Sequence, residues 1–166
     1  LRLEAGRDYD VVNTDNDHRY RDYWQTYHRL TARKGVTAQF AKIEMRRRLT
    51  LIGAMLLYKG DVDGMLCGTW GNSALHLHYI EQVIGLREGA RTFACMNGLL
   101  LPGRQVMLVD THINYDPTAE QLAEITVMAA EVMVRLGLRP KAALLSHSNF
   151  SSSNHPFSVK IRETLS

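Results

Sequence analysis

The sequence predicts an α/β fold with a mostly parallel, partly mixed sheet. Helix-like segments alternate with short apolar segments along most of the 166 residues, a pattern typical of helices that pack on a parallel sheet. Pro102 and Gly103 mark a tight turn between two apolar runs, which adds one antiparallel hairpin. The sequence contains no internal repeat and no low-complexity linker.

The N-terminal half is expected to be mostly helical. Aromatic and apolar residues from Tyr20 to Leu30 recur at spacings of three and four, which predicts one apolar helix face. A fully apolar run that ends before Gly60 is typical of a buried helix. In order, we expect a strand at 9–13, a helix capped by Asp17 and ended by Lys34 and Gly35, a helix that begins at Thr37, a buried helix at 49–58, a buried strand at 65–68 and a helix at 73–84.

The C-terminal half is expected to contain the hairpin and a long amphipathic helix. Asp116 stands where an N-cap residue would, Pro117 suits the first helical position, and Gly137 suits the stop. In order, we expect hairpin strands at 92–96 and 105–110, the helix from Asp116 to Gly137, a strand at 141–145 and a helix that begins near Pro156.

Composition excludes several classes of protein. Hydrophobic residues make up 45% and charged residues 22%, as in an ordinary globular domain rather than a disordered chain. No apolar run approaches the roughly 20 residues that span a bilayer, so a membrane partner is not expected. Two cysteines are too few for a disulfide framework, which favours a cytoplasmic location and a packing role for Cys67 and Cys95.

The net charge of +3 is concentrated near the N-terminus. Residues 1–50 hold 11 of the 20 Lys and Arg but 7 of the 17 Asp and Glu. A nucleic-acid surface would concentrate more positive charge and interleave it with aromatic residues. We therefore expect a solvated helix face and no nucleic-acid partner.

Three segments follow predicted strands, where ligands gather in open α/β sheets. Segment 68–73 combines glycines with a helix start that could hold an anion, segment 110–117 offers Asp110 and His112 as polar groups, and segment 146–154 is rich in Ser and Asn. Each segment also has a plain explanation as a turn, a helix cap or a solvent loop. His76 and His78 are two apart on a helix, so they are expected to be separate residues and not a metal pair.

These segments together resemble a known family. Residues 68–73, 109–131 and 140–152 resemble phosphotransacetylases, and in particular the phosphotransacetylase-like C-terminal domain of the large bacterial NADP-dependent malic enzymes. The resemblance implies a three-layer sandwich like that of phosphotransacetylase and isocitrate dehydrogenase, here incomplete, so we expect the chain to be a fragment. It implies the end of a first, mostly helical subdomain at 1–62 and a second, α/β subdomain at 63–166, truncated at its C-terminus.

Phosphotransacetylases move acetyl between the coenzyme A thiol and phosphate. The resemblance implies that a catalytic Ser, Arg and Asp set of the family lies beyond this chain. It also implies that His78 stands where the family has a phosphate-binding Arg. A histidine lacks the permanently charged, bidentate guanidinium, so no catalytic residue is expected in the chain.

The resemblance favours a non-catalytic module of an NADP-dependent malic enzyme, which converts malate to pyruvate and CO2. The module would sense acetyl-CoA or coenzyme A and support a dimer or higher homo-oligomer, whereas NADP and a divalent metal would bind an upstream malic enzyme domain. A piece of a true phosphate acetyltransferase and a scaffold for oligomer contacts stay open as alternatives. No metal ligand or resident cofactor is expected in the chain itself. The residues expected to line an acetyl-CoA or phosphate cleft are Gly68, Thr69, Asn114, Asp116, Ser146, Ser148, Asn149, Ser151 and Ser152.

Overall fold

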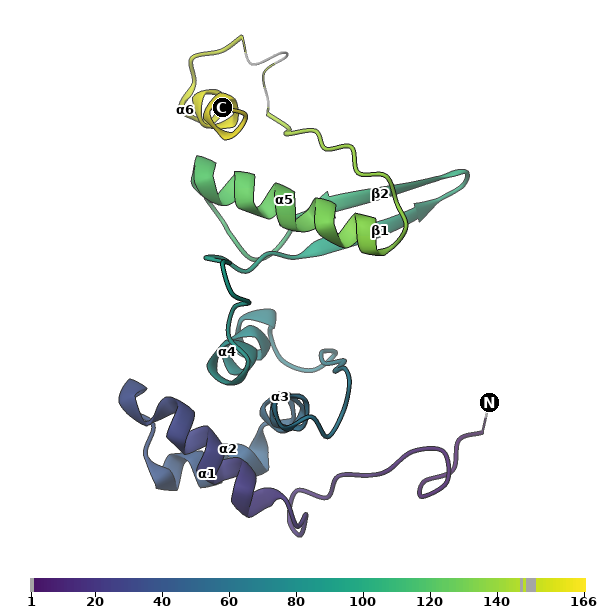
Figure 1. The fold of residues 1–166 in the computed structure, drawn as a ribbon, viewed down its shortest axis with the longest axis vertical. Helices are drawn as coiled ribbons and strands as arrows, with labels where there is room; N and C mark the ends of the chain where they lie inside the picture. The colour runs from purple at the N-terminus through teal and green to yellow at the C-terminus, as the bar shows by residue number, and fades with distance from the viewer. Residues whose placement is uncertain (1, 147, 149–151) are drawn as a thin grey trace. The chain divides into compact units, whose positions relative to one another are not determined.

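The computed structural model describes residues 2–146, 148 and 152–166, and it divides into two compact units that meet at Gly85 and Leu86 (Figure 1). The N-terminal unit is helical, and the C-terminal unit combines a β-hairpin with two helices. The boundary expected between residues 62 and 63 concerned the two subdomains of the family's whole domain and not these compact units. That boundary stays a prediction.

The N-terminal unit contains the helices that the residue pattern predicts. Thr37 caps one of them with its hydroxyl, which accepts a hydrogen bond from the Phe40 amide at 3.2 Å. Gly35 and Gly60 adopt left-handed conformations where helices end. The elements are α1 (Tyr20–Thr31), the 3-10 helix η1 (Ala32–Lys34), α2 (Ala38–Arg47), α3 (Leu49–Lys59) and α4 (Ser73–Val83).

Helix α3 is the central element of this unit and packs against α1, α2 and α4. The side chains of Leu51, Ala54 and Met55 are fully buried, and Ile52 is nearly so. Leu49, in the first turn of the same helix, is 74% exposed. The apolar composition of α3 thus follows from its position among three other helices.

The side chain of Met65 lies directly on helix α3 at Gly53, a residue that has no side chain. A Cβ atom added at Gly53 would lie 2.6 Å from the Met65 sulfur. The Met65 side chain therefore packs directly on α3 at Gly53, and a larger residue at 53 would require that side chain to shift.

Three buried tyrosines carry polar links through the helical core. The Tyr27 hydroxyl donates to Gln82 Oε1 at 2.6 Å, Tyr23 donates to Asp61, and Tyr79 donates to Glu44. Burial raises the pKa of Tyr27 to about 12. Each hydroxyl thus has a partner, and the helices are held in register by directional bonds as well as by apolar packing.

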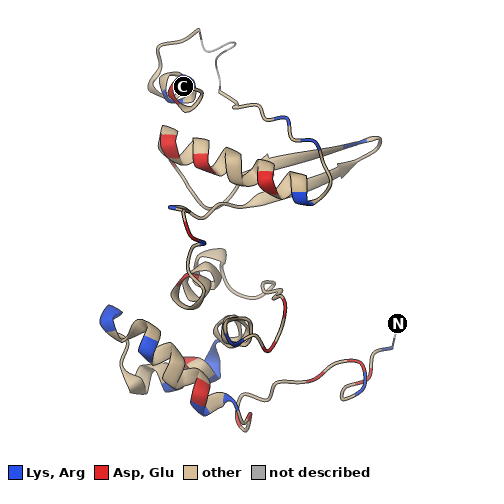
Figure 2. Ribbon diagram, in the orientation of Figure 1, with Lys and Arg blue, Asp and Glu red and all other residues tan. Residues whose placement is uncertain are grey.

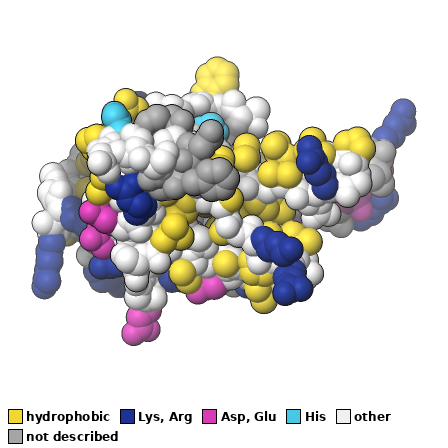
Figure 3. Space-filling view, turned by 90° about the horizontal axis from the view of Figure 1, so that it is seen from above, with side chains coloured by type: hydrophobic (Ala, Val, Ile, Leu, Met, Phe, Trp, Pro, Cys, Tyr) yellow, Lys and Arg dark blue, Asp and Glu magenta, His cyan; other side chains and the backbone are white. Residues whose placement is uncertain are grey.

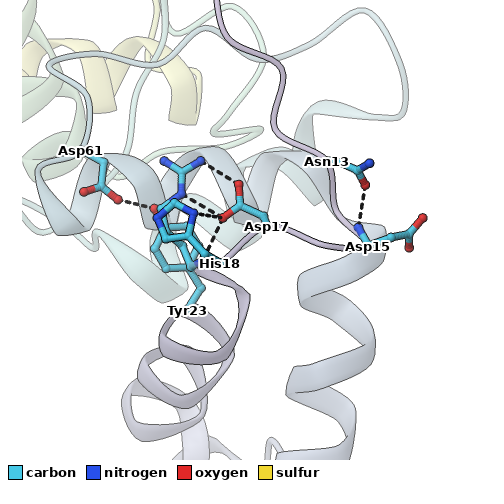
Figure 4. A network of polar contacts seen from close by, with 7 residues as sticks. Asn13, Asp15, Asp17, His18, Tyr23 and Asp61 are labelled. Carbon is cyan, nitrogen blue, oxygen red and sulfur yellow. Dashed lines mark hydrogen bonds and ion pairs between the residues drawn. The ribbon is translucent and has the colours of Figure 1, made fainter.

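Helix α1 begins differently from the prediction. Arg19 is the N-cap residue, and no side chain caps the helix. The Asp17 carboxylate accepts from the Arg19 amide at 2.9 Å and from the Arg19 guanidinium at 2.9 and 2.8 Å (Figure 4). Asp17 is therefore engaged by Arg19, and this bond to the guanidinium is the main cause that lowers the Asp17 pKa to about 2.

The C-terminal unit contains an antiparallel hairpin of β1 (Met96–Leu101) and β2 (Arg104–Val109), with Met96 opposite Val109 and Leu101 opposite Arg104. The expected turn at Pro102 and Gly103 is confirmed, but the first strand begins where the predicted one ended. Helix α5 (Ala119–Arg135) packs against β2 and against α6 (Pro156–Thr164).

Helix α5 is capped by Thr118, and the expected capping by Asp116 is wrong. The Thr118 hydroxyl accepts from the Gln121 amide at 3.2 Å, and the Gln121 side chain accepts from the Thr118 amide at 2.9 Å. This reciprocal capping box satisfies two backbone donors, so it places the helix start two residues after Asp116. The predicted stop at Gly137 is confirmed, with a left-handed backbone there.

The expected mostly parallel sheet is not formed by the described residues. Their one sheet is the two-stranded hairpin, and residues 9–13, 65–68 and 141–145 form no strand. Within the N-terminal segment, one isolated bridge joins Ala5 and Tyr9. A strand exists only through hydrogen bonds to a neighbouring strand, and β-prone composition alone does not supply that neighbour.

Burial on α3 makes a matched pair of leucines a direct test of the core. Leu51→Ala should lower the free energy of unfolding by about 2–5 kcal/mol, because it removes a fully buried side chain. Leu49→Ala, on the same helix, should change it by no more than about 0.5 kcal/mol. Urea unfolding followed by circular dichroism measures both, and equal effects would contradict the assigned burial.

The Asp17–Arg19 pair predicts a pH dependence. Because the folded pKa of Asp17 is lowered, its contribution to stability is present above about pH 4 and is lost as the pH falls toward 2. Arg19→Met should return the Asp17 pKa toward its usual value, whereas Arg21→Met on exposed helix surface should leave it low. Carboxyl-carbon chemical shifts in an NMR titration read this pKa, and an unchanged value in Arg19→Met would refute the assignment.

Candidate functional site

The loop before α4 is the most exposed of the predicted ligand segments. Gly68, Thr69 and Gly71 have positive φ angles of 140°, 69° and 93°. Such a conformation is rare for a β-branched residue and costs on the order of 1–3 kcal/mol at Thr69. Among the described residues, no hydrogen bond reaches the backbone amides of Gly68 and Thr69 or the Thr69 hydroxyl. These groups face solvent with their donors free.

His76 connects this loop to the core of the N-terminal unit. Its Nε2 lies 2.8 Å from the Trp70 carbonyl oxygen, and its Nδ1 lies 2.6 Å from the Thr50 hydroxyl on α3. A carbonyl only accepts, so Nε2 carries the hydrogen, and in a neutral ring Nδ1 accepts from Thr50. His76 is thus separate from His78, as expected, and both of its ring nitrogens have partners.

His78 is exposed on α4, two residues after His76. Its ring meets the ring of Tyr79 edge to face, with centroids 5.4 Å apart. The Tyr79 hydroxyl is bonded to Glu44, which in turn accepts from Arg48 Nε at 3.1 Å. The charged groups of this chain of contacts, Glu44 and Arg48, are engaged with each other and with Tyr79, and none of these contacts places a cation beside His78.

In the C-terminal unit, Asn114 braces the turn after β2. Asp110 has a φ of 51°, and its Oδ2 accepts from the Asn114 amide at 3.1 Å and from its side chain at 2.7 Å. The same Asn114 side chain donates to the Phe93 carbonyl at 2.8 Å, while Asp110 Oδ1 accepts from the Cys95 amide at 3.3 Å. Asn114 therefore joins two segments of backbone, and its amide hydrogens are used within the protein.

The remaining predicted residues of this unit are divided between helix contacts and a serine cluster. Asp116 is exposed and forms an ion pair with Lys160 on α6. Ser148 Oγ lies 3.2 Å from Ser146 Oγ and 2.9 Å from the buried hydroxyl of Ser158. The structure thus brings Ser146 and Ser148 together, against the first turn of α6.

The predicted residues belong to both units. Gly68 and Thr69 lie in the N-terminal unit, whereas Asn114, Asp116, Ser146, Ser148 and Ser152 lie in the C-terminal unit. Asn149 and Ser151 lie outside the described residues. Ser152 is exposed.

The two cysteines differ from the expectation of core packing. Cys67 is exposed, next to the loop at Gly68, and Cys95 is half-buried with its sulfur 3.2 Å from the Thr111 hydroxyl.

Within the described parts of the chain, no three His, Cys, Asp or Glu residues gather as a metal site requires. No helix there is long and apolar enough to cross a membrane.

An apolar groove runs between the hairpin and the end of α5. It is lined by Leu100, Leu101, Met107, Met133 and Leu138 together with Arg104, Gln105 and Arg139. Leu100 is the most exposed hydrophobic side chain of the hairpin. On the face drawn in Figure 3, hydrophobic side chains likewise lie among Lys and Arg. None of the predicted ligand residues lines this groove.

Charge is distributed differently along the two units. Lys and Arg mark α1 and α2 in Figure 2, and α5 carries acidic residues with Arg135 at its end. On α1 and α2, Lys42 lies 4.6 Å from the Trp24 ring centroid and Arg46 lies 4.5 Å from that of Tyr20. These cations lie over aromatic rings of their own unit. The expected solvated face stays a prediction.

Comparison with known proteins decides the family. The model of the protein family described as "Phosphate acetyl/butaryl transferase" matches residues 1–166, the whole chain. The chain belongs to this family. The resemblance seen in the three sequence segments is thereby confirmed.

Similar proteins fall into two groups. NADP-dependent malic enzymes of Salmonella typhimurium and Escherichia coli are 46% and 44% identical over 165 residues, which is 99% of this chain and 22% of each enzyme. A phosphate acetyltransferase of Nitratidesulfovibrio vulgaris is 30% identical over 152 residues, 90% of this chain and 21% of that protein. The chain thus spans about a fifth of the length of these curated relatives.

A solved structure supports the fold. The EutD phosphotransacetylase from Staphylococcus aureus aligns with a TM-score of 0.80 at 23% identity, over 95% of this chain and 47% of that one. At this identity the likeness concerns the fold alone. The chain therefore has a phosphotransacetylase-type fold of helices and a small sheet.

Asn114 and Asp116, both predicted as ligand residues, should respond differently to substitution. Asn114→Ala should destabilise the protein by about 1–3 kcal/mol, because it leaves the Asp110 carboxylate and the Phe93 carbonyl without their partner. Asp116→Asn should change stability by at most about 1 kcal/mol, since its ion pair is exposed. Thermal unfolding measures both, and a neutral Asn114→Ala would argue against a bracing role.

Proposed function

We propose that this chain is part of a non-catalytic, acetyl-CoA-sensing module of an NADP-dependent malic enzyme. The observation that carries the proposal is the identity of 44–46% to two NADP-dependent malic enzymes over 99% of the chain, against 30% to a phosphate acetyltransferase. In this proposal, NADP and a divalent metal bind an upstream malic enzyme domain that oxidises and decarboxylates malate. The module contributes to a homo-oligomer of the whole enzyme.

The loop from Gly68 to Asn72 supports binding of a phosphate-bearing ligand. Its exposed amides and the Thr69 hydroxyl are free donors, and they precede the N-terminus of the 11-residue helix α4. Helix N-termini favour anions because their backbone N–H groups and dipole point at the ligand. Acetyl-CoA and coenzyme A carry phosphates that such donors recognise.

His78 argues against phosphate transfer at this site. It occupies the position where the family resemblance places a phosphate-binding Arg, and its ring packs on Tyr79. A histidine cannot offer the bidentate, permanent cation that stabilises a reacting phosphate. The module thus retains donors for binding without the group that the transfer reaction needs.

The intact domain is proposed to form the three-layer sandwich of the family. Segments 65–68 and 141–145 are apolar, and in this proposal they become strands of a mostly parallel sheet once neighbouring strands are present. Ser146, Ser148, Asn149, Ser151 and Ser152 would then follow a strand end, where ligands gather in such sheets.

Three assays on the intact protein test the proposed function. Calorimetry should show binding of acetyl-CoA, and exchange between acetyl phosphate and coenzyme A should stay at background. Acetyl-CoA should also alter the rate of malate oxidation. Robust acetyl exchange would overturn the proposal in favour of a phosphate acetyltransferase, and absence of acetyl-CoA binding would favour a scaffold for oligomer contacts.

One pair of variants connects this binding to the loop. Thr69→Val keeps the β-branched shape but removes the free hydroxyl, and it should weaken acetyl-CoA binding about fivefold. Thr14→Val makes the same chemical change at a half-buried position before α1, outside the loop, and should leave affinity unchanged. Equal affinities for the two variants would remove Thr69 from the site.

A further inference from the structure

We infer that His76 is a positioning residue that fixes the Gly68–Asn72 loop on helix α3 in the conformation that presents its donors to the ligand. The inference rests on the proposed binding of acetyl-CoA at this loop. It assigns a role to a side chain that does not itself face the ligand donors, because both ring nitrogens are already bonded within the protein.

The loop needs a restraint from outside its own backbone. Three of its residues have positive φ angles, and one of them is Thr69, which is unfavourable in that region. Strained conformations persist only when the surrounding structure determines them. The loop is exposed, with Trp70 89% accessible, so packing of its own side chains does not hold it in place.

The two bonds of His76 connect the loop to a buried position. On one side the ring donates from Nε2 to the Trp70 carbonyl, in the middle of the loop, at 2.8 Å. On the other side it meets the hydroxyl of Thr50, which is only 8% exposed and lies on α3, at 2.6 Å. The loop carbonyl is thus fixed to the central helix of the unit through one side chain.

The same helix also holds the chain just before the loop. Met65 packs on Gly53, where the absence of a side chain allows contact with α3. The segment between Met65 and Trp70 is therefore anchored on α3 at both ends. The anchors leave residues 66–69 between them, all exposed, and these include Gly68 and Thr69.

Helix capping does not explain these contacts. Asn72 already caps α4, because its side-chain oxygen accepts from the Leu75 amide at 2.8 Å. The His76 ring bonds are additional to that cap. They also survive protonation of the ring, since the Thr50 hydroxyl can accept from Nδ1 as well as donate to it.

His76→Phe and His76→Gln in the intact protein test the inference. The phenylalanine keeps the ring but removes both nitrogens, and it should weaken acetyl-CoA binding in calorimetry about fivefold to tenfold. The glutamine amide can still donate to the Trp70 carbonyl and should restore part of the affinity. His28→Phe, a half-buried histidine on α1 outside this network, is the matched control and should bind like wild type.

Hydrogen exchange and urea unfolding separate positioning from general stability. We expect faster amide exchange in 68–72 of His76→Phe, with exchange in α3 and with the unfolding midpoint close to wild type. Unchanged affinity in His76→Phe would overturn the inference. Weaker binding accompanied by faster exchange throughout α3 and by a lower midpoint would overturn it too, because the role would then be structural.

The proposed function and the inference fail in different ways. If the wild-type protein binds no acetyl-CoA, the proposed function fails, and hydrogen exchange still tests the link between His76 and the loop. Faster exchange confined to 68–72 in His76→Phe would then support that link, and unchanged exchange would refute it.

Discussion

Burial of helix α3 is the constraint on which the rest of the N-terminal unit depends. Its apolar side chains are covered by α1, α2 and α4, and this burial supplies the non-directional part of the stability. The polar links from Tyr23, Tyr27 and Tyr79 then select one arrangement of the helices around it. Thr50 and Gly53 use the same helix to hold the chain that leads to the candidate ligand loop.

Helices could be predicted from the sequence because their signals are local. Apolar periodicity, the Thr37 cap and the glycines after helices act within a few residues, and each of these elements is present. Two helix starts were predicted wrongly. Asp17 does not cap α1, because its carboxylate is bonded to Arg19, and Asp116 does not cap α5, because the Thr118–Gln121 pair forms a capping box there. Strands depend on a distant neighbour, so apolar segments such as 65–68 could not be assigned from composition alone.

The candidate site shows the same division between local and distant information. The glycines of the 68–73 loop can be read from the sequence, and the structure shows positive φ angles at Gly68 and Gly71, and also at Thr69, which the sequence did not indicate. The roles of Asn114 and His76 could not be read from spacing, because their partners Phe93 and Thr50 lie 21 and 26 residues away. Membership of the phosphate acetyl/butaryl transferase family was predictable, since it rests on three runs of residues that need no three-dimensional information.

The contact between Gly53 and Met65 has a consequence for the residues that position 53 can hold. Because the Met65 sulfur fills the space that a side chain at position 53 would occupy, the two positions form one steric unit across 12 residues of sequence. Alanine at 53 would require the Met65 side chain to shift or a shorter residue to stand at 65. Because methionine is flexible, the size of the residue tolerated at 53 depends on how freely the side chain at 65 can repack.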